Sequence, residues 1–317
     1  MRSEGYHDGM KRTKGFLATI LSAIAYGSAP LIATLVYGYG FGVNSVSLMR
    51  VLLPVPVLAL AVLLKKEESF RIGGRQALQI LALAVAGSVL TSLLLFQSIR
   101  FIDTGIATAL NFSYPALVVL LDRLVYRQKA DRHQWIALGF CLAGVVMFIS
   151  PGGTFTWKGF FLALGSGLAF ALYVLYMDRS RIMETMSFCS FSFWFFLFSA
   201  LLLAPFALAS GELRGGSAPG GWLLLALFAL VDGLAGTLLQ EYGVNAIGGK
   251  SASIASTVEP VICAVLGAVF LHERITLRSA LGVCLIVGAT VYLIIGGRDR
   301  KDRDPPRDDN VKERETI

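Results

Sequence analysis

Continuous apolar stretches, most of them close to the length of a membrane-spanning helix, constrain this chain more than any other feature. Ten of them occupy residues 16–37, 44–64, 77–97, 105–126, 134–150, 159–177, 187–209, 222–242, 250–271 and 279–297. About 20 apolar residues in a helix cross the hydrocarbon core of a bilayer, whereas a transmembrane β-barrel would show shorter segments of alternating polarity. We therefore predict an all-α integral membrane protein with ten transmembrane helices.

Charged residues are scarce in these stretches, which excludes a soluble fold. Only 15% of the 317 residues are charged, against about 25% in an average soluble protein. Between residues 16 and 297 there are only 12 acidic side chains. A soluble domain of that length would need more charged residues on its water-exposed surface. Tails over residues 1–15 and 298–317 hold much of the remaining charge, and we predict both tails to be disordered.

The distribution of basic residues predicts how the chain is oriented in the membrane. If the N-terminus is cytoplasmic, the inner segments, counted with the span-end residues Arg123 and Lys250, hold 22 Lys and Arg residues and the outer loops hold 5. Cytoplasmic loops carry such an excess, so we predict that both termini lie in the cytoplasm and that the protein sits in the cell inner membrane. Because the basic residues alternate with apolar spans, the net charge of +7 does not indicate nucleic acid as a partner.

Matching segments separated by a nearly constant offset indicate an internal repeat. Pro115 and Pro260 are 145 residues apart, LGFCL and LGVCL begin at Leu138 and Leu281, and GFLATILSAIAY aligns with GFFLALGSGLAF at an offset of 144. Two five-helix repeats follow, over residues 16–150 and 159–297. Five spans is an odd number, so the second repeat must be inverted in the membrane. Inverted repeats are typical of secondary transporters, in which substrate binds near the midplane.

Two stretches carry a resemblance to a known family. They are SLMRVLLPVPVLAL around Arg50 and TVEPVICAVLGAVFLHERITLRSALGVCLIVGATVYL from Thr257 to Leu293. With the two five-span repeats, they resemble the drug/metabolite transporter superfamily and specifically its EamA-type permeases. The chain departs from the family pattern at Tyr26, where Trp is usual, and at Gln128, where Glu is common. The resemblance implies a central cavity lined by spans one, three, four, six, eight and nine, with spans five and ten peripheral.

Two acidic residues lie near the middle of the predicted spans. Asp232 is ten residues into span eight and Glu259 is nine residues into span nine, about 15 and 13 Å deep by the helical rise. An ionisable group at that depth is costly and is a functional candidate. Each carboxyl is predicted to bind a cationic substrate group, to carry a coupling proton, or to hydrogen-bond a kinked backbone; for Glu259, which precedes Pro260, a structural or gating role stays open.

The other acids of the spans lie close to predicted span ends. Asp122 and Asp178 each precede an arginine at a cytoplasmic end, and Glu241 is one residue from the inner end of span eight. We predict that these three side chains are solvated or, for the two aspartates, paired locally.

Further candidates surround these positions. Arg50 either extends to the outer interface or pairs with an anionic substrate group or a cavity acid. Asn111 and Tyr114, with Ser113 and Thr257, surround the mid-span prolines and can satisfy carbonyls freed there. Pro115 and Pro260 are the predicted gating hinges. Tyr26 is a candidate for an aromatic, cation-binding wall, together with Tyr173, Tyr176 and Trp194.

Several functional classes lack the residues they require. The chain has no nucleotide-binding GxxxxGK[ST] motif, and its histidines, His7, His133 and His272, lie outside the span interiors. Cys141, Cys189, Cys263 and Cys284 lie inside apolar segments, in a pattern that favours neither disulfides nor a metal site. We therefore expect neither an enzyme nor a cofactor.

The combined prediction is a secondary transporter that exports small polar or amphipathic metabolites, such as amino acids, by alternating access. The expected partners are the substrate, the lipid bilayer and protons, with coupling through Glu259 or Asp232 as a hypothesis. One alternative is a cationic drug exporter, which would require Asp232 to face an aromatic cage. The other is a membrane scaffold or receptor that transports nothing.

Overall fold

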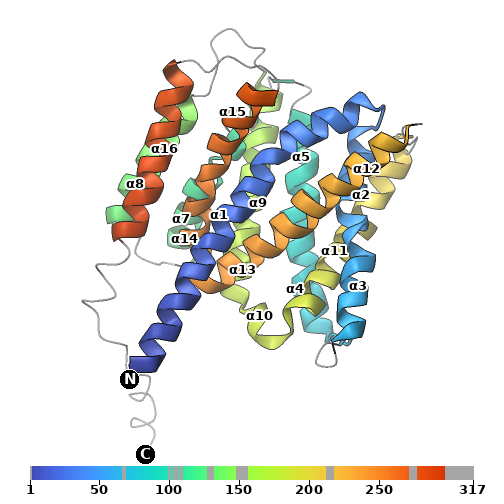
Figure 1. The fold of residues 1–317 in the computed structure, drawn as a ribbon, viewed down its shortest axis with the longest axis horizontal. Helices are drawn as coiled ribbons and strands as arrows, with labels where there is room; N and C mark the ends of the chain where they lie inside the picture. The colour runs from blue at the N-terminus through green and yellow to red at the C-terminus, as the bar shows by residue number, and fades with distance from the viewer. Residues whose placement is uncertain are drawn as a thin grey trace, which may run out of the picture.

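Almost all of the residues that the structure of the protein, a computed structural model, describes lie in helices, and none of them lies in a strand (Figure 1). These residues are 2–65, 69–98, 101–102, 107, 110–126, 132–147, 156–211, 218–270 and 277–296. Six of the helical segments are long and apolar enough to cross a membrane: Arg12–Gly38, Val43–Leu64, Gly74–Ser98, Trp157–Ser180, Phe188–Ala209 and Pro219–Ile247. The predicted all-α membrane architecture is therefore confirmed, with six spans identified by this criterion.

The first half of the chain supplies eight of the labelled helical elements. They are α1 (Arg2–Gly38), α2 (Val43–Leu52), α3 (Pro54–Leu64), α4 (Gly74–Ala84), the π-helix η1 (Val85–Leu90), α5 (Thr91–Ser98), α7 (Tyr114–Tyr126) and α8 (Arg132–Met147). The break between α2 and α3 falls at Leu53, immediately before Pro54, whose missing N–H suits the first position of a helix.

The second half follows the same order. Its elements are α9 (Trp157–Ser180), α10 (Ile182–Thr185), α11 (Phe188–Ala209), α12 (Pro219–Phe228), the π-helix η2 (Ala229–Gly236), α13 (Thr237–Ile247), α14 (Gly249–Ala255), the 3₁₀ turn η3 (Ser256–Val258), α15 (Glu259–Phe270) and α16 (Leu277–Gly296). Each of the ten predicted apolar stretches thus overlaps a helix of the structure, although several of those helices are interrupted.

The N-terminal segment differs from its prediction. Helix α1 begins at Arg2, so the residues before 16 continue the first helix instead of forming a disordered tail. The physical reason is that extending an existing helix costs much less than nucleating one, and this segment contains good helix formers such as Glu, Lys, Arg and Met. The other predicted tail, 298–317, lies outside the described residues.

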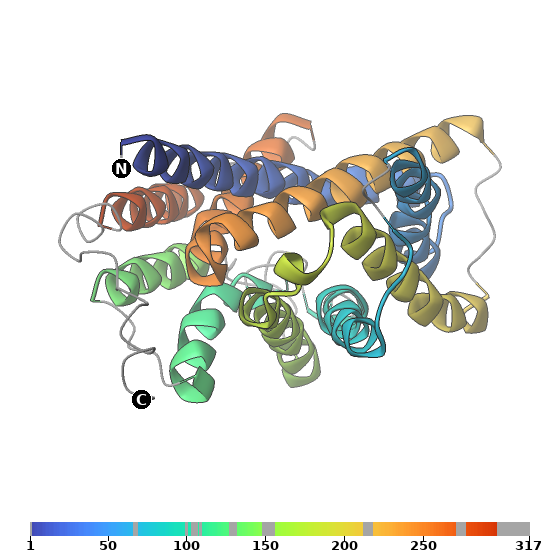
Figure 2. The ribbon, with the colours of Figure 1, turned by 90° about the horizontal axis from the view of Figure 1, so that it is seen from below.

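The two halves pack against each other in an exchanged arrangement. Helix α1 packs along η2 and α13, and helix α9 packs along η1 and α5; Figure 2 shows α1 lying beside α13. The first helix of each half therefore packs against the third helical segment of the other half. We call these third segments, α4–η1–α5 and α12–η2–α13, rods. This exchange makes one continuous bundle from two similar units.

The π-helices follow the repeat offset found in the sequence. Val85 and Ala229, where η1 and η2 begin, are 144 residues apart. Next to each π-helix, a serine from the other half donates to a backbone carbonyl: Ser22 to the Gly236 oxygen at 2.7 Å, and Ser166 to the Thr91 oxygen at 2.8 Å. A π-helix disturbs the regular ladder of hydrogen bonds and is common at functional sites, and here each disturbance is matched by a hydroxyl of the facing helix.

The outside of the bundle is apolar. Large side chains such as Leu17, Leu21, Leu63 and Leu223 are exposed, as expected of a surface that faces hydrocarbon instead of water. Helices α8 and α16 pack against each other at one side of the bundle, and α2, α3, α11 and α12 lie at the opposite side (Figure 1). The middle of the bundle, between these two groups, contains the cavity.

Candidate functional site

A cavity of about 380 Å³ lies in the centre of the bundle. Its walls come from α1, α2, η1, α5, α7, α9, α11, α12, η2, α13 and α15, together with residues just before α7. All six residues predicted to bind substrate or to couple transport lie on these walls: Tyr26, Arg50, Asn111, Tyr114, Asp232 and Glu259. Helices α8 and α16, within their described parts, supply no lining residue. Spans two and seven contribute to the walls in addition to the six spans that the resemblance implied.

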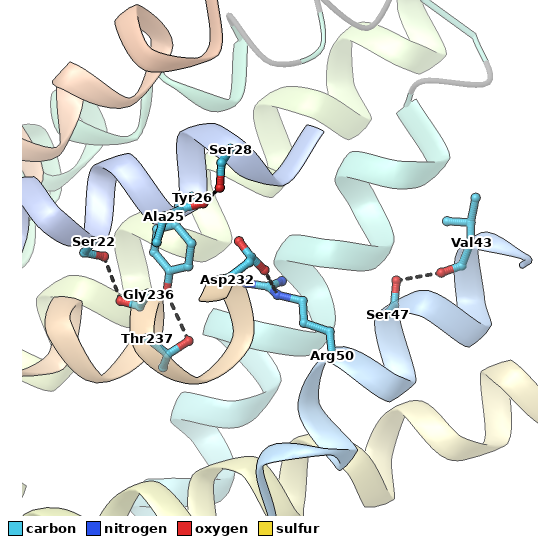
Figure 3. Close-up of polar contacts among 10 residues, drawn as sticks. All are labelled: Ser22, Ala25, Tyr26, Ser28, Val43, Ser47, Arg50, Asp232, Gly236 and Thr237. Atoms are coloured by element: carbon cyan, nitrogen blue, oxygen red, sulfur yellow. Dashed lines mark hydrogen bonds and ion pairs between the residues drawn. The ribbon is translucent and has the colours of Figure 1, made fainter. Parts of the chain in front are cut away.

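Arg50 and Asp232 form an ion pair across the cavity wall between α2 and η2 (Figure 3). The Asp232 side chain is only 3% exposed, whereas the Arg50 side chain keeps 22% of its surface accessible. Gly233 permits this approach, because a Cβ at that position would overlap the backbone carbonyl oxygen of Arg50. Of the two alternatives for Arg50, the structure therefore shows pairing with a cavity acid.

Tyr26 completes this part of the wall. The guanidinium carbon of Arg50 lies 5.9 Å from the centre of the Tyr26 ring, within the range of a cation–π contact. The Tyr26 hydroxyl donates to Thr237 Oγ1 at 3.1 Å (Figure 3). At Gly236 a Cβ would lie 2.8 Å from the ring, so the absence of a side chain there makes room for Tyr26. The tyrosine is thus fixed between α1 and the η2–α13 rod.

Aromatic side chains dominate the rest of the wall. Ten of the 25 lining residues are aromatic and three are charged, so most of the surface is apolar. Tyr114 and Phe170 meet edge to face, with ring centres 4.7 Å apart. Two predicted members of the aromatic wall lie elsewhere: Trp194 donates from Nε1 to the Phe70 carbonyl oxygen at 3.2 Å, and Tyr176 packs against the hydrophobic core.

As far as the described lining residues show, the cavity extends toward one end of the bundle. Its lining includes Tyr37 near the end of α1 and Val43 at the start of α2. Toward the opposite end, no lining residue precedes Tyr26 on α1 or follows Thr237 on α13. Tyr26, Tyr173 and Thr237 therefore form the closed floor of the cavity.

The two mid-span prolines follow breaks in their helices. Helix α7 begins at Tyr114, directly after a turn at Phe112 and Ser113, and α15 begins at Glu259, directly after η3. Pro115 and Pro260 are each the second residue of the new helix and are buried. A proline lacks the N–H that would continue the ladder of the preceding turn, which accounts for both breaks.

Asn111 and Glu259 flank these breaks on the cavity wall. Ser166 Oγ lies 2.9 Å from Asn111 Oδ1, so the amide is held by α9. The backbone of Glu259 lies close to α1, since a Cβ on Gly27 would be 2.8 Å from its carbonyl oxygen. Among the residues placed by the structure, the Glu259 carboxyl forms no ion pair.

The prediction for Asp122 was wrong. Its side chain is fully buried and pairs with Arg179 of α9 at 2.5 Å and Lys250 of α14 at 2.5 Å, instead of being solvated or paired with Arg123. The guanidinium of Arg123 lies over the Trp135 ring, 6.0 Å from its centre. Helix packing explains the difference, because α7, α9 and α14 bring their ends together. We call Asp122, Arg179 and Lys250 the Asp122 cluster.

Glu241 is the functional candidate that the sequence analysis missed. It was placed one residue from the end of span eight, but α13 continues to Ile247, so its side chain is fully buried. Ser192 of α11 donates to Glu241 Oε2 at 2.8 Å. The sequence did contain a sign that the helix continues past the predicted end. Val244 and Ile247, three and six residues after Glu241, are apolar and lie within two turns of it.

Comparisons with known proteins agree on one family. The model of the EamA-like transporter family matches residues 13–150 and again residues 157–295. The uncharacterized inner membrane transporter YicL of Salmonella typhimurium is 26% identical over 298 residues, which cover 90% of this chain and 97% of YicL. The uncharacterized transporter sll1319 of Synechocystis is 29% identical over 208 residues, or 63% of this chain and 61% of that protein.

Two further matches concern an exporter and a solved structure. The threonine/homoserine exporter RhtA of Salmonella typhimurium is 26% identical over 204 residues, which cover 62% of this chain and 65% of RhtA. A crystal structure with 17% sequence identity superposes with a TM-score of 0.72 and covers 90% of this chain and 98% of its own. The second match shows that the fold is shared.

Proposed function

Because the chain belongs to the EamA-like transporter family, we propose that it is a secondary transporter that exports amino acids and related small polar or amphipathic metabolites. In this proposal ten helices cross the inner membrane as two inverted repeats, and both termini lie in the cytoplasm. The excess of basic residues on one side and the exchanged packing of the two halves support it.

The observation that carries the proposal is the Arg50–Asp232 pair in a mostly apolar cavity rich in aromatic side chains. A single charge entering such an environment would lose hydration without full compensation. A zwitterion brings an ammonium and a carboxylate side by side, and the pair presents the complementary charges side by side. The substrate carboxylate would bind the Arg50 guanidinium, and its ammonium would bind the Asp232 carboxylate.

The relatives support the same substrate class. RhtA is named an exporter of threonine and homoserine, both of which are zwitterions at neutral pH. The aromatic walls add a surface for the apolar part of an amphipathic substrate. We therefore propose amino acids as the first compounds to test.

The proposed mechanism is alternating access, in which the cavity opens to one side of the membrane at a time. The cavity reaches toward the end of the bundle where α1 joins α2, which the proposed topology places outside. The breaks before Pro115 and Pro260 allow the two halves of each interrupted helix to move separately. Export requires a second state in which the floor formed by Tyr26, Tyr173 and Thr237 opens and the outer end closes.

Cationic drugs are the second candidate substrates, favoured by the aromatic lining and by Glu259. The argument against cationic drugs is that Asp232 is already paired with Arg50, so a lone cation would have to separate this ion pair. A zwitterion replaces both partners at once. This difference makes the two candidates distinguishable by experiment.

Growth tolerance tests the proposal in cells. Cells that produce the protein should tolerate toxic amino-acid analogues better than cells without it, while their tolerance of cationic drugs should not change. Asp232→Asn should abolish the effect, whereas Glu184→Gln, a change at an exposed residue of α10, should not. Tolerance of cationic drugs alone would favour the drug exporter, and no effect on any compound would favour a scaffold or receptor.

A further inference from the structure

We propose that Glu241 is the proton-binding site of the transporter, located beneath the floor of the cavity. This inference rests on the proposed function, since a bound proton couples transport only in a protein that transports. It differs from the sequence-based hypothesis, which assigned coupling to Asp232 or Glu259.

The surroundings of Glu241 favour a neutral carboxylic acid. Its side chain is fully buried, one oxygen accepts from Ser192, and within the described structure the other oxygen, Oε1, has no hydrogen-bond partner. A carboxylate with one hydrogen bond and no cation is among the most costly groups to bury. A bound proton removes that charge.

Within the part of the chain that the structure describes, the groups that face Glu241 supply no compensating positive charge. Tyr173 of α9 and Tyr26 of α1 interact electrostatically with it, and both tyrosines are neutral at physiological pH. From α11 the facing group is the Ser192 hydroxyl. On α14, the Lys250 ammonium is bound to Asp122.

Asp232 and Glu259 are less suited to this role. Asp232 is already held in an ion pair with the Arg50 guanidinium in the state described. Glu259 lies on the cavity wall, where a substrate ammonium can reach it. Glu241 is separated from the substrate by the cavity floor, so its proton and the substrate need not compete for the same atoms.

Two hydroxyl groups of the cavity floor, those of Thr237 and Tyr26, belong to the part of the cavity wall nearest in sequence or in charge interaction to Glu241. Thr237 lines the cavity and lies four residues before Glu241 on α13, which places both side chains on the same helix face about 6 Å apart along the axis. The Tyr26 hydroxyl donates to Thr237 Oγ1 at 3.1 Å. In this proposal a proton from cavity water passes along these hydroxyls, and a water molecule is needed for the step of about 6 Å from Thr237 to the Glu241 carboxylate. When the floor opens, the carboxyl is hydrated and releases the proton to water on the other side.

The test compares two assays in proteoliposomes, both of which follow a labelled mixture of the common amino acids supplied on the outside. Exchange without a gradient measures transport alone, and accumulation driven by a pH gradient measures coupling. With one proton per substrate, a gradient of one pH unit supports about tenfold accumulation. We expect this from the wild type. Glu241→Gln should exchange at the wild-type rate and accumulate nothing above equilibration, and the matched exposed change, Glu184→Gln, should behave as the wild type.

Each failure has a separate meaning. An absence of exchange by the wild type would overturn the proposed function. Exchange by the wild type without proton-driven accumulation, or accumulation that survives in Glu241→Gln, would overturn the role of Glu241 alone. If Glu241→Gln does not fold, Ser192→Ala decides: losing the donor to Oε2 should move the pH of half-maximal accumulation upward, and an unchanged pH profile would contradict the inference.

Discussion

Asp232 and Arg50 neutralise each other in the cavity wall, so neither acts as the isolated charge that its position in the sequence suggests. The depth of Asp232 could be predicted from its distance to the span end. Pairing of Arg50 with a cavity acid was one of several alternatives, and the sequence could not decide among them, because the contact joins α2 to η2 across the two halves of the chain and depends on Gly233 to bring the backbones together.

Asp232→Asn should destabilise the protein more than the double change Asp232→Asn with Arg50→Gln. Removing one partner of a buried pair leaves an uncompensated charge, at a cost of about 3–5 kcal/mol for a fully buried pair. The cost here should be smaller, because Arg50 remains partly exposed. Thermal unfolding in detergent measures both variants, and a double variant less stable than Asp232→Asn would contradict the account.

Glu241 shows where a prediction from hydropathy fails at the level of one residue. A charged residue close to the end of an apolar stretch was interpreted as the end of the span, and that assumption removed it from the candidates. In the structure the helix continues and the facing helix supplies Ser192. Hydropathy cannot detect such a partner because the two residues are 49 positions apart.

At the scale of elements, the π-helices η1 and η2 are the main departure from regular spans. Both lie in the cavity wall, and each lies next to a cross-repeat serine bond, from Ser22 or from Ser166. The repeat offset itself was visible in the sequence. The π-turns were not, since their hydrogen-bond pattern depends on packing with the other half of the chain.

Ser22→Ala should lower the free energy of unfolding by about 1–3 kcal/mol, the usual cost of leaving a buried polar group without a partner. Ser28→Ala is the matched control, because the Ser28 hydroxyl donates within its own helix to Ala25; its effect should stay within about 0.5 kcal/mol. Chemical denaturation in detergent provides the comparison. Equal effects of the two changes would show that the cross-repeat bond does not stabilise the fold.

The breaks at Pro115 and Pro260 were predicted correctly as interruptions, because proline has a local and known effect on a helix. Their role as hinges is a prediction of the proposed mechanism. Pro260→Ala restores an N–H donor and removes the ring, so the helix can become continuous across the break.

Pro115→Ala and Pro260→Ala should therefore slow amino-acid exchange without lowering thermal stability. The control is Pro205→Ala in α11, an exposed proline inside a helix and outside the cavity lining. That change should raise stability, since an interior proline costs about 3 kcal/mol, and should leave exchange unchanged. Exchange at the wild-type rate by both cavity-side variants would argue against hinge motion.

At the scale of the whole molecule, the Asp122 cluster joins the two halves beyond the closed end of the cavity. Asp122 lies eight residues after Tyr114 on α7, about 12 Å along the helix axis. The positions related to the cluster by the repeat offset are Gly267, Leu35 and Gly105, none of which is charged. The two ends of the bundle are therefore chemically different even though the repeats are similar.

Asp122→Asn should destabilise the protein, because Arg179 and Lys250 would remain close together without their shared carboxylate; the cost should be below the about 3–5 kcal/mol of a fully buried pair, since both cations are partly exposed. Glu184→Gln, which breaks the exposed contact with Arg181, should cost less than about 1 kcal/mol. Thermal unfolding separates the two expectations. A change as small for Asp122→Asn as for Glu184→Gln would mean that the cluster contributes little to holding the halves together.

Recognition of a zwitterion by the Arg50–Asp232 pair is the central claim, and amino-acid exchange in proteoliposomes tests it most directly. We predict that the wild type exchanges labelled amino acids faster than empty liposomes do, and that unlabelled amino acids compete. Their esters, which lack the carboxylate, and their N-acyl derivatives, which lack the ammonium, should not compete. The claim would be contradicted if the esters and the N-acyl derivatives competed as effectively as the free amino acids. It would also be contradicted if exchange were no faster than in empty liposomes.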